Sequence, residues 1–236
     1  MVTIMGIINA TPDSFWAPSR GAVGILDDGP DIVDVGAVST RPGAAPVSEK
    51  EEWSRLIPVL DAVAGRCPFS VDTVRASIVQ RVYDRYGPFI VNDISAGEDD
   101  PRMLPLTGRL GLGYIAMHKR GNPRTMDSLT DYGEGGVTAE LIRYFSDFSL
   151  KAADAGISEW ILDPGLGFAK TAGQNFEIID SLAALKCFGR RILIGAADKR
   201  FTAGHTEEVH LRAIRGGADI LRVHDVRAAR KTASAA

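Results

Sequence analysis

Short apolar runs that end in a polar side chain and a turn recur along the whole chain. The pattern is plainest where the apolar run 160–162 is followed by Asp163, Pro164 and Gly165. A run without polar alternation is typical of a parallel strand covered on both faces, and Pro-Gly ends the strand and turns the chain. Eight such runs predict buried strands at residues 3–9, 31–36, 69–72, 89–93, 113–117, 160–163, 191–195 and 220–225.

Helical patterns lie between most of these runs. Ser48 is predicted to cap a helix, with Glu51 at the capping-box position. Further helices are expected at residues 74–86, 137–155 and 176–185, with a short one near 22–26 and a polar, frayed tail over 228–236. The side chains predicted to face the core are Trp53, Leu56, Ile57 and Leu60, then Ile78, Val82 and Tyr83, then Leu141, Tyr144, Phe145, Phe148 and Leu150.

Strands that alternate with helices predict an α/β fold, a TIM (β/α)8 barrel with its active site at the C-terminal ends of the strands. The chain has 236 residues, near the lower end of the range of roughly 200 to 400 that such barrels span. One domain over residues 1–236 is the economical interpretation, although length alone would also permit two.

Composition narrows the class of protein. Hydrophobic residues make up 45% of the chain, and the net charge is -3, so nothing predicts a general attraction for nucleic acid. The two cysteines, Cys67 and Cys187, stand far apart without partners at metal-ligand spacing, which predicts free thiols. No run is long enough to span a membrane and no leader precedes the first strand, so we expect a cytoplasmic enzyme that binds small molecules.

Three polar side chains end predicted strands and would meet at one mouth of the barrel. Asp72, Asn92 and Asp163 together supply two carboxylates and a carboxamide. A carboxylate accepts two hydrogen bonds side by side, and Asn both donates and accepts. The set therefore suits a flat heterocycle that carries several N–H donors. Taken alone, Asp163 could equally be a residue that caps a turn.

Loops at the predicted mouth add further chemistry. The loop 9–15 combines amide, carboxylate and hydroxyl oxygens with an aromatic ring, so it could hold a hard cation and cover a ligand, or form an ordinary turn. Lys199 could pair with a ligand or remain a surface lysine. Arg222 and His224 lie on the same side of the last strand, where barrels often bind phosphate, whereas His118 is expected to be structural.

Seven segments in register resemble dihydropteroate synthase, the folate-pathway member of the pterin-binding TIM-barrel family. Single segments are common, but seven in order over nearly the whole chain are specific. The segments are Met5-Gly-Ile-Ile-Asn-Ala-Thr-Pro-Asp-Ser-Phe15, Ser39-Thr-Arg-Pro-Gly43, Ser70-Val-Asp-Thr73, Val91-Asn-Asp-Ile-Ser95, Met117-His118, Asp163-Pro-Gly-Leu-Gly-Phe168 and Arg222-Val-His-Asp225.

The resemblance implies an enzyme that condenses 6-hydroxymethyl-7,8-dihydropterin diphosphate with p-aminobenzoate and uses Mg²⁺ as cofactor. It also implies a homodimer, and a family of enzymes that sulfonamides target. Its catalytic residues would be Asp72, Asp163 and Lys199. The resemblance assigns the pterin to Asp72, Asn92, Met117, Asp163, Phe168 and Lys199, the diphosphate to Asn9, Arg222 and His224, the metal to Asn9, and p-aminobenzoate to loops that carry Asp13, Phe15, Ser39, Thr40, Arg41 and Pro42.

The chain departs from the family where Ala197-Asp198-Lys199-Arg200 replaces the usual Ser-Arg-Lys-Ser, and the loop after Phe201 is short. These departures favour one alternative, a non-catalytic or altered-specificity pterin-binding paralogue. A methyltransferase that binds methyltetrahydrofolate is a further alternative. The two mouth-loop segments, and the lack of an attached corrinoid domain, argue against it.

Overall fold

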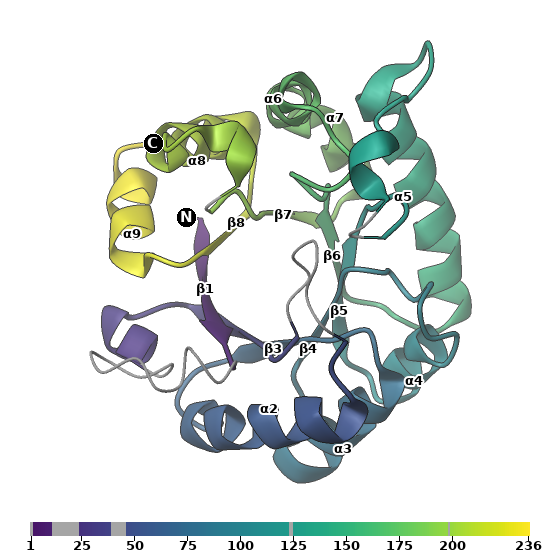
Figure 1. The fold of residues 1–236 in the computed structure, drawn as a ribbon, viewed down its shortest axis with the longest axis vertical. Helices are drawn as coiled ribbons and strands as arrows, with labels where there is room; N and C mark the ends of the chain where they lie inside the picture. The colour runs from purple at the N-terminus through teal and green to yellow at the C-terminus, as the bar shows by residue number, and fades with distance from the viewer. Residues whose placement is uncertain (1, 11–23, 39–45, 123–124, 198) are drawn as a thin grey trace.

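Eight parallel strands form a closed barrel in the computed structural model, which describes residues 2–10, 24–38, 46–122, 125–197 and 199–236. Each strand pairs with its neighbour in sequence, and the first pairs with the last to close the ring (Figure 1). This confirms the predicted TIM barrel. The strands are β1 Thr3–Asn9, β2 Ile32–Gly36, β3 Phe69–Asp72, β4 Ile90–Asp93, β5 Gly113–Met117, β6 Trp160–Asp163, β7 Arg191–Ile194 and β8 Ile220–Val223.

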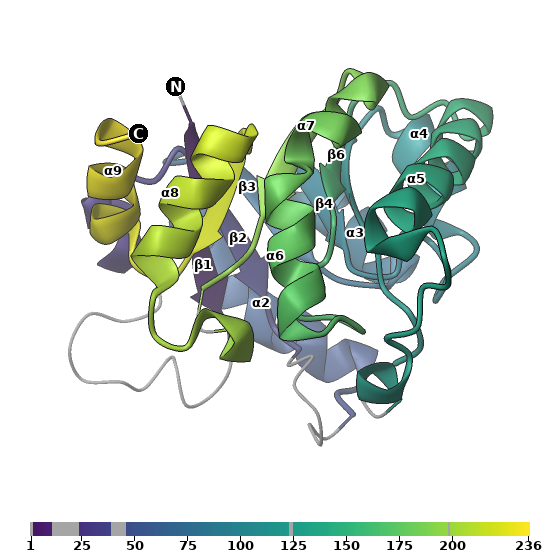
Figure 2. The same ribbon diagram turned by 90° about the horizontal axis from the view of Figure 1, so that it is seen from above.

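Helices surround the barrel and bury its outer face (Figures 1 and 2). The α-helices are α2 Glu49–Val63, α3 Ala76–Tyr86, α4 Met103–Arg109, α5 Gly136–Asp154, α6 Ala172–Asp180, α7 Leu182–Leu185, α8 Thr206–Gly216 and α9 Val226–Ser234. Short 3-10 helices are η1 Gly24–Asp28, η2 Met126–Ser128, η3 Lys186–Phe188 and η4 Arg200–Thr202. No helix in the described ranges is long and apolar enough to cross a membrane.

The inside of the barrel has an apolar layer below a polar one. Met5, Ile32, Ile115, Leu193 and Ile220 form a separate buried cluster within the ring. Side chains on a strand repeat every two residues, so the inward position two residues further along carries Asp34 in β2 and Arg222 in β8. The apolar layer thereby supports a polar layer at the C-terminal ends of the strands.

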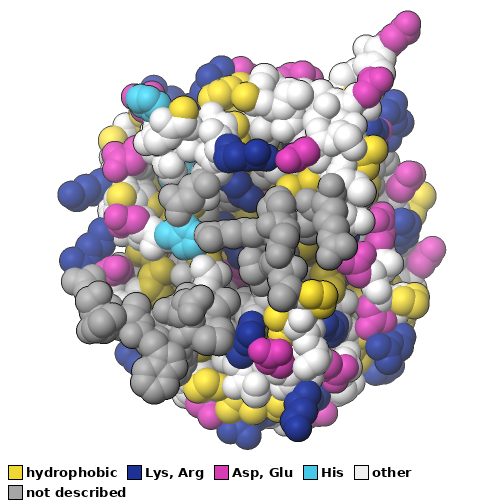
Figure 3. Space-filling model, in the orientation of Figure 1, with side chains coloured by type: hydrophobic (Ala, Val, Ile, Leu, Met, Phe, Trp, Pro, Cys, Tyr) yellow, Lys and Arg dark blue, Asp and Glu magenta, His cyan; other side chains and the backbone are white. Residues whose placement is uncertain are grey.

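The charged side chains of the chain lie mostly outside this core. Acidic and basic groups are interspersed over the face seen in Figure 3, without a large patch of one sign. Two helix starts follow their sequence signals: the Glu51 amide donates to Ser48 Oγ at 3.2 Å, and Thr171 with Gln174 forms a capping box that begins α6. Such caps satisfy amides that lack partners inside the helix.

Several local predictions were wrong. Leu150 was expected in the core, but its side chain is 67% exposed, because it lies two residues, about 200° of helix, beyond the buried Phe148. The segment predicted as one helix over 176–185 is divided at Ser181 between α6 and α7. Ile57 is only partly buried, while Val59 and Glu52 of the same helix are buried.

The tail is helical rather than frayed. Asp225 caps α9 by accepting from the Ala228 amide at 2.9 Å, and Val226, Ala229 and Thr232 form its buried face. Arg230 also donates to Asp31 Oδ2 at 3.0 Å, which ties the helix to the start of β2. The helix cap, the buried face and the ion pair together stabilise this segment as a helix despite its polar composition.

Candidate active site

A network of buried and half-buried polar groups spans the mouth of the barrel. Arg222 Nε donates to Asp34 Oδ2 at 2.6 Å, and Arg222 Nη2 donates to Asp72 Oδ2 at 3.0 Å. Asn92 Nδ2 donates to the same Asp34 oxygen at 3.0 Å, while Ser70 Oγ donates to Asp34 Oδ1 at 2.5 Å. Asp34 is fully buried, so these contacts offset the cost of removing its charge from water. Four strands thus hold one cation between two carboxylates.

The electrostatics of Asp72 differ from those of an exposed acid. The pKa of Asp72 is raised to about 7, mainly by burial and also by the charges of Asp34, Asp93 and Glu52, while the Arg222 guanidinium acts in the opposite direction. The same two acids, Asp34 and Asp72, push the pKa of Arg222 further above its usual range, against the effect of burial. A carboxyl group with a pKa near neutral pH can donate a proton to a ligand or accept one from it.

Asp163 faces this network from β6. Its Oδ1 accepts from the Gly165 amide at 2.8 Å, and burial raises its pKa, although that amide and the cations of Arg222 and Lys199 act in the opposite direction. Lys199 Nζ lies 4.4 Å from the centre of the Phe168 ring. The carboxylate, the aromatic ring and the ammonium group therefore meet beside the Arg222 network.

These side chains line a small pocket of about 70 Å³ at the C-terminal ends of the strands. All six side chains that sequence assigns to the pterin lie in it, although their roles remain predictions. The lining residues are Asp72, Asn92, Ile94, Met117, Asp163, Gly165, Leu166, Phe168, Gly195, Lys199 and Arg222.

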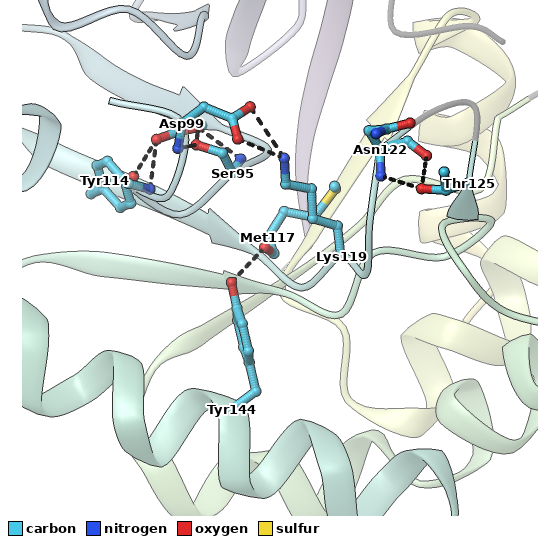
Figure 4. Close-up of polar contacts among 10 residues, drawn as sticks. Ser95, Asp99, Tyr114, Met117, Lys119, Asn122, Thr125 and Tyr144 are labelled. Atoms are coloured by element: carbon cyan, nitrogen blue, oxygen red, sulfur yellow. Dashed lines mark hydrogen bonds and ion pairs between the residues drawn. The ribbon is translucent and has the colours of Figure 1, made fainter. Parts of the chain in front are cut away.

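A larger cavity of about 430 Å³ adjoins the small pocket and shares Asp72, Ile94 and Phe168 with it. Lys119 and Arg120 line its far side, beyond the end of β5. Figure 4 shows how this side is held: Lys119 Nζ contacts Asp99 Oδ1 at 3.1 Å, and Tyr144 of α5 donates to the Met117 carbonyl oxygen at 3.1 Å. A ligand that fills the small pocket can therefore extend outward without leaving the barrel mouth.

The residues predicted for the diphosphate end the neighbouring strands β1 and β8, although Arg222 and His224 line different pockets. Arg222 lies in the small pocket, and Asn9 is exposed at the end of β1. His224 lines a different cavity, of about 400 Å³, together with His205 and His210. The residues predicted for p-aminobenzoate, which are Asp13, Phe15, Ser39, Thr40, Arg41 and Pro42, lie outside the described residues.

The expected Mg²⁺ has a limited set of candidate ligands. The described ranges contain no group of three or more His, Cys, Asp or Glu side chains that could hold a metal ion. Mg²⁺ usually keeps several waters and takes one or two protein oxygens together with substrate phosphates. The exposed Asn9 at the end of β1 suits that mode, so the donor set fits a cation that arrives with a diphosphate.

Sequence reasoning missed Asp34, which anchors the network. It lies in the middle of β2, within a run of buried residues, and was treated as part of an apolar strand. One signal was available: Asp34 precedes the strand end by two residues, so it shares the inward face with Gly36. An acid on the inward face of a buried strand requires a partner.

Gly165 gives a direct test of the loop that follows Asp163. Its φ is 69°, and a Cβ atom there would lie 2.0 Å from the His118 carbonyl oxygen. We expect Gly165→Ala to lower the free energy of unfolding by about 2–5 kcal/mol, since left-handed strain and a backbone clash add.

Gly189 is the matched control, because it has φ 61° and a Cβ atom there would meet no described atom within 4 Å beyond its chain neighbours. Gly189→Ala should cost about 1–2 kcal/mol in the same urea titration, and equal losses would contradict the clash.

A closed barrel with two carboxylates, an amide, an arginine and a lysine around one pocket defines the class of protein. It is a barrel enzyme whose site, at the C-terminal ends of its strands, suits a small, polar, planar ligand.

Comparison with known proteins identifies the family. The model of the pterin binding enzyme family matches residues 5–224. The dihydropteroate synthase of Synechocystis is 39% identical, over 95% of this chain and 86% of the relative. The chain therefore belongs to the pterin-binding enzyme family and groups within it with the dihydropteroate synthases, which are transferases of folate biosynthesis.

Solved structures agree with this placement. The Yersinia pestis dihydropteroate synthase, solved with a sulfonamide drug complex, has a TM-score of 0.90 at 31% identity and covers 99% of this chain and 92% of its own. The Thermus thermophilus enzyme in complex with 4-aminobenzoate has a TM-score of 0.87 at 34% identity, with 99% and 93% covered. Fold and sequence thus point to the same family.

Proposed function

We propose that this chain condenses 6-hydroxymethyl-7,8-dihydropterin diphosphate with p-aminobenzoate, giving 7,8-dihydropteroate and pyrophosphate. One observation carries the proposal: Asp72, Asn92, Met117, Asp163, Phe168 and Lys199 line one pocket in a chain whose relatives are dihydropteroate synthases. In this proposal residues 1–236 form a single pterin-binding domain.

Each polar group of the pocket has a role in binding the pterin. Asp163 and Asp72 accept hydrogen bonds from its ring N–H groups, and Asn92 supplies both a donor and an acceptor. Lys199 pairs with a ring nitrogen or carbonyl, and Met117 and Phe168 enclose the flat faces. Burial removes the Asp163 carboxylate from water, and this desolvation raises its pKa. The ring N–H groups of a bound pterin donate hydrogen bonds to the carboxylate and so offset the desolvation cost.

The same groups suit the chemical step. Cleavage of the bond between the pterin methylene carbon and the diphosphate oxygen leaves a pterin-methyl cation. The carboxylates of Asp72 and Asp163 stabilise this cation, and Asn9, Arg222 and His224 stabilise the departing diphosphate. The p-aminobenzoate nitrogen then bonds to the methylene carbon and loses a proton. No nucleophilic side chain is needed. Mg²⁺, when bound near Asn9, would neutralise part of the diphosphate charge.

The altered segment after β7 changes the expected handling of p-aminobenzoate. Arg200 is exposed, and its Nη2 lies 3.2 Å from Asp127 Oδ2, so its charge is directed toward η2. The family's hydroxyl side chains at positions 197 and 200 are absent. We expect this chain to bind p-aminobenzoate and its sulfonamide mimics more weakly than a relative that has them.

The test is pyrophosphate release from the pterin diphosphate with Mg²⁺, measured with and without p-aminobenzoate. Release that rises with p-aminobenzoate, together with dihydropteroate as product, is the expected result. Asp163→Ala is the inactive control. Tight pterin binding without p-aminobenzoate-dependent release would instead identify a paralogue that holds the pterin but lacks the second site. No pterin binding would refute the proposal altogether.

Assembly and location belong to the same proposal. We expect a homodimer that forms through the outer helices of the barrel and works in the cytoplasm. Sedimentation of the purified protein at micromolar concentration measures the oligomeric state. Fractionation of the source cells measures the location. A sedimenting species of one chain would refute the dimer.

A further inference from the structure

Lys170 is a partly buried cation that the proposed reaction does not use. It ends the loop that follows β6, and its Nζ makes three contacts there. The atom lies 3.0 Å from the Gly165 carbonyl oxygen, 2.9 Å from the Phe168 carbonyl oxygen and 3.0 Å from His118 Nδ1. Two of the contacts are therefore to the loop itself, and the third is to the residue that follows β5.

These contacts use all the hydrogen-bonding capacity of the ammonium group. A lysine ammonium has three N–H donors and no acceptor, so no donor remains for a substrate. His118 is buried, and burial together with Lys170 and Arg120 lowers its pKa to about 2. The imidazole is thus neutral and accepts from Lys170 at Nδ1. Lys170 is consequently placed to hold the loop rather than to contact the ligand.

The loop needs to be held in place because its backbone is strained at one residue, Ala169. Gly165, Gly167 and Ala169 all have positive φ, with 51° at Ala169, a conformation that costs a residue with a Cβ atom. Two other elements fix the same loop: Asn175 Oδ1 of α6 accepts from the Gly167 amide at 2.8 Å, and the Tyr132 hydroxyl donates to the Ala169 carbonyl oxygen at 2.9 Å. Of the three side chains that hydrogen-bond to this loop from Lys170, Asn175 and Tyr132, that of Lys170 is the charged one.

The loop carries two of the groups that face the pocket. The Gly165 amide donates to Asp163 Oδ1 at 2.8 Å, so the residue whose carbonyl Lys170 binds also orients the carboxylate. Lys170 also donates to the backbone carbonyl oxygen of Phe168, and the ring of the same residue lies against the Lys199 ammonium group. We propose that Lys170 is a positioning residue of the pterin site, which aims the Asp163 carboxylate and the Phe168 ring by holding the Gly165–Phe168 loop. This inference rests on the proposed function.

Charge makes the hold dependent on pH. The titratable and charged groups around Lys170 are His118 and Arg120 after β5, Glu140 on α5, Asp163 in β6 and Lys199 after β7. Burial lowers the pKa of Lys170 to about 7, against the opposing effect of Asp163. The cation is present below that pH and is lost as pH rises through it. Asp72 also has a pKa of about 7, so the expected result is that the pterin affinity of the wild type falls relative to that of Lys170→Arg over this pH range.

The experiment compares Lys170→Met, Lys170→Arg and Lys186→Met by calorimetric titration with the bare pterin, followed by steady-state kinetics. Lys170→Met is expected to weaken pterin binding about tenfold or more per folded molecule, the scale of one misplaced charge-assisted hydrogen bond. KM for the pterin diphosphate should rise, and kcat should fall as well, because the Asp163 carboxylate that Lys170 positions also stabilises the pterin-methyl cation. Lys186 pairs with Asp219 on the surface, so Lys186→Met should bind like the wild type.

The outcomes separate this inference from the proposed function. Wild-type affinity in folded Lys170→Met overturns the positioning role alone. A wild-type protein that binds no pterin overturns the proposed function and the positioning role together. If Lys170→Met does not fold, Lys170→Arg decides: wild-type affinity that falls relative to this variant as pH rises supports the role, and the same pH dependence in both proteins overturns it.

Discussion

Replacing Asp163 with alanine is expected to weaken pterin binding by about 30- to 1000-fold without unfolding the barrel. The ligand N–H groups would lose a charged acceptor in a buried site, a loss of about 2–4 kcal/mol. The fold itself gains, because burial raises the pKa of Asp163 and so opposes the carboxylate in the empty site. We therefore expect the free energy of unfolding to stay level or increase.

Calorimetric titration with the bare pterin and urea unfolding measure the two effects on the same preparation. Asp180→Ala is the matched control, since Asp180 forms an exposed pair with Arg212 far from the pocket. Affinity in Asp163→Ala equal to that of the control would show that Asp163 only caps the turn at Gly165.

Replacing Arg222 with methionine is expected to have the largest effect on stability. It leaves Asp34, which is fully buried, and Asp72 without their shared cation. Removing one partner of a buried ion pair typically costs about 3–5 kcal/mol, because the remaining charge stays desolvated. Ligands that carry the diphosphate should also lose much more affinity than the bare pterin.

Two further variants isolate the cause. Arg212→Met breaks only the exposed pair with Asp180 and should cost at most about 1 kcal/mol. Adding Asp34→Asn to Arg222→Met removes the stranded charge, so the double variant should recover part of the lost stability. An Arg222→Met protein as stable as Arg212→Met would contradict the shared-cation network, and equal losses for both pterin ligands would contradict the diphosphate role.

The barrel was predictable from sequence because its signals are local. Each strand is an apolar run, and its end is marked by a polar residue or a turn, as at Asp163-Pro164-Gly165. The same rule found Asp72, Asn92 and Asp163, since the ends of parallel strands meet at one face of the barrel. The position after the seventh strand indicated Lys199, and the family segments added Met117 and Phe168; the structure places all three in the same pocket.

Other features depend on contacts between distant parts of the chain. Asp34 was overlooked because nothing next to it in sequence shows that Arg222 reaches it across the barrel. The tail was expected to fray because its composition is polar, whereas its Arg230 binds Asp31 near the other end of the chain. Lys170 likewise lies two residues after the Asp163–Phe168 segment, but its contact with His118 could be seen only in the fold.

The ion pair between Arg222 and Asp34 joins positions 188 residues apart. During synthesis β2 leaves the ribosome long before β8. A growing chain therefore carries Asp34 and Asp72 before Arg222 has been added. These acids then repel each other in the incomplete ring. Arrival of β8 closes the barrel and completes the site in one event. A pterin is therefore a ligand of the finished chain, and it should stabilise nascent chains only after the last strand has emerged.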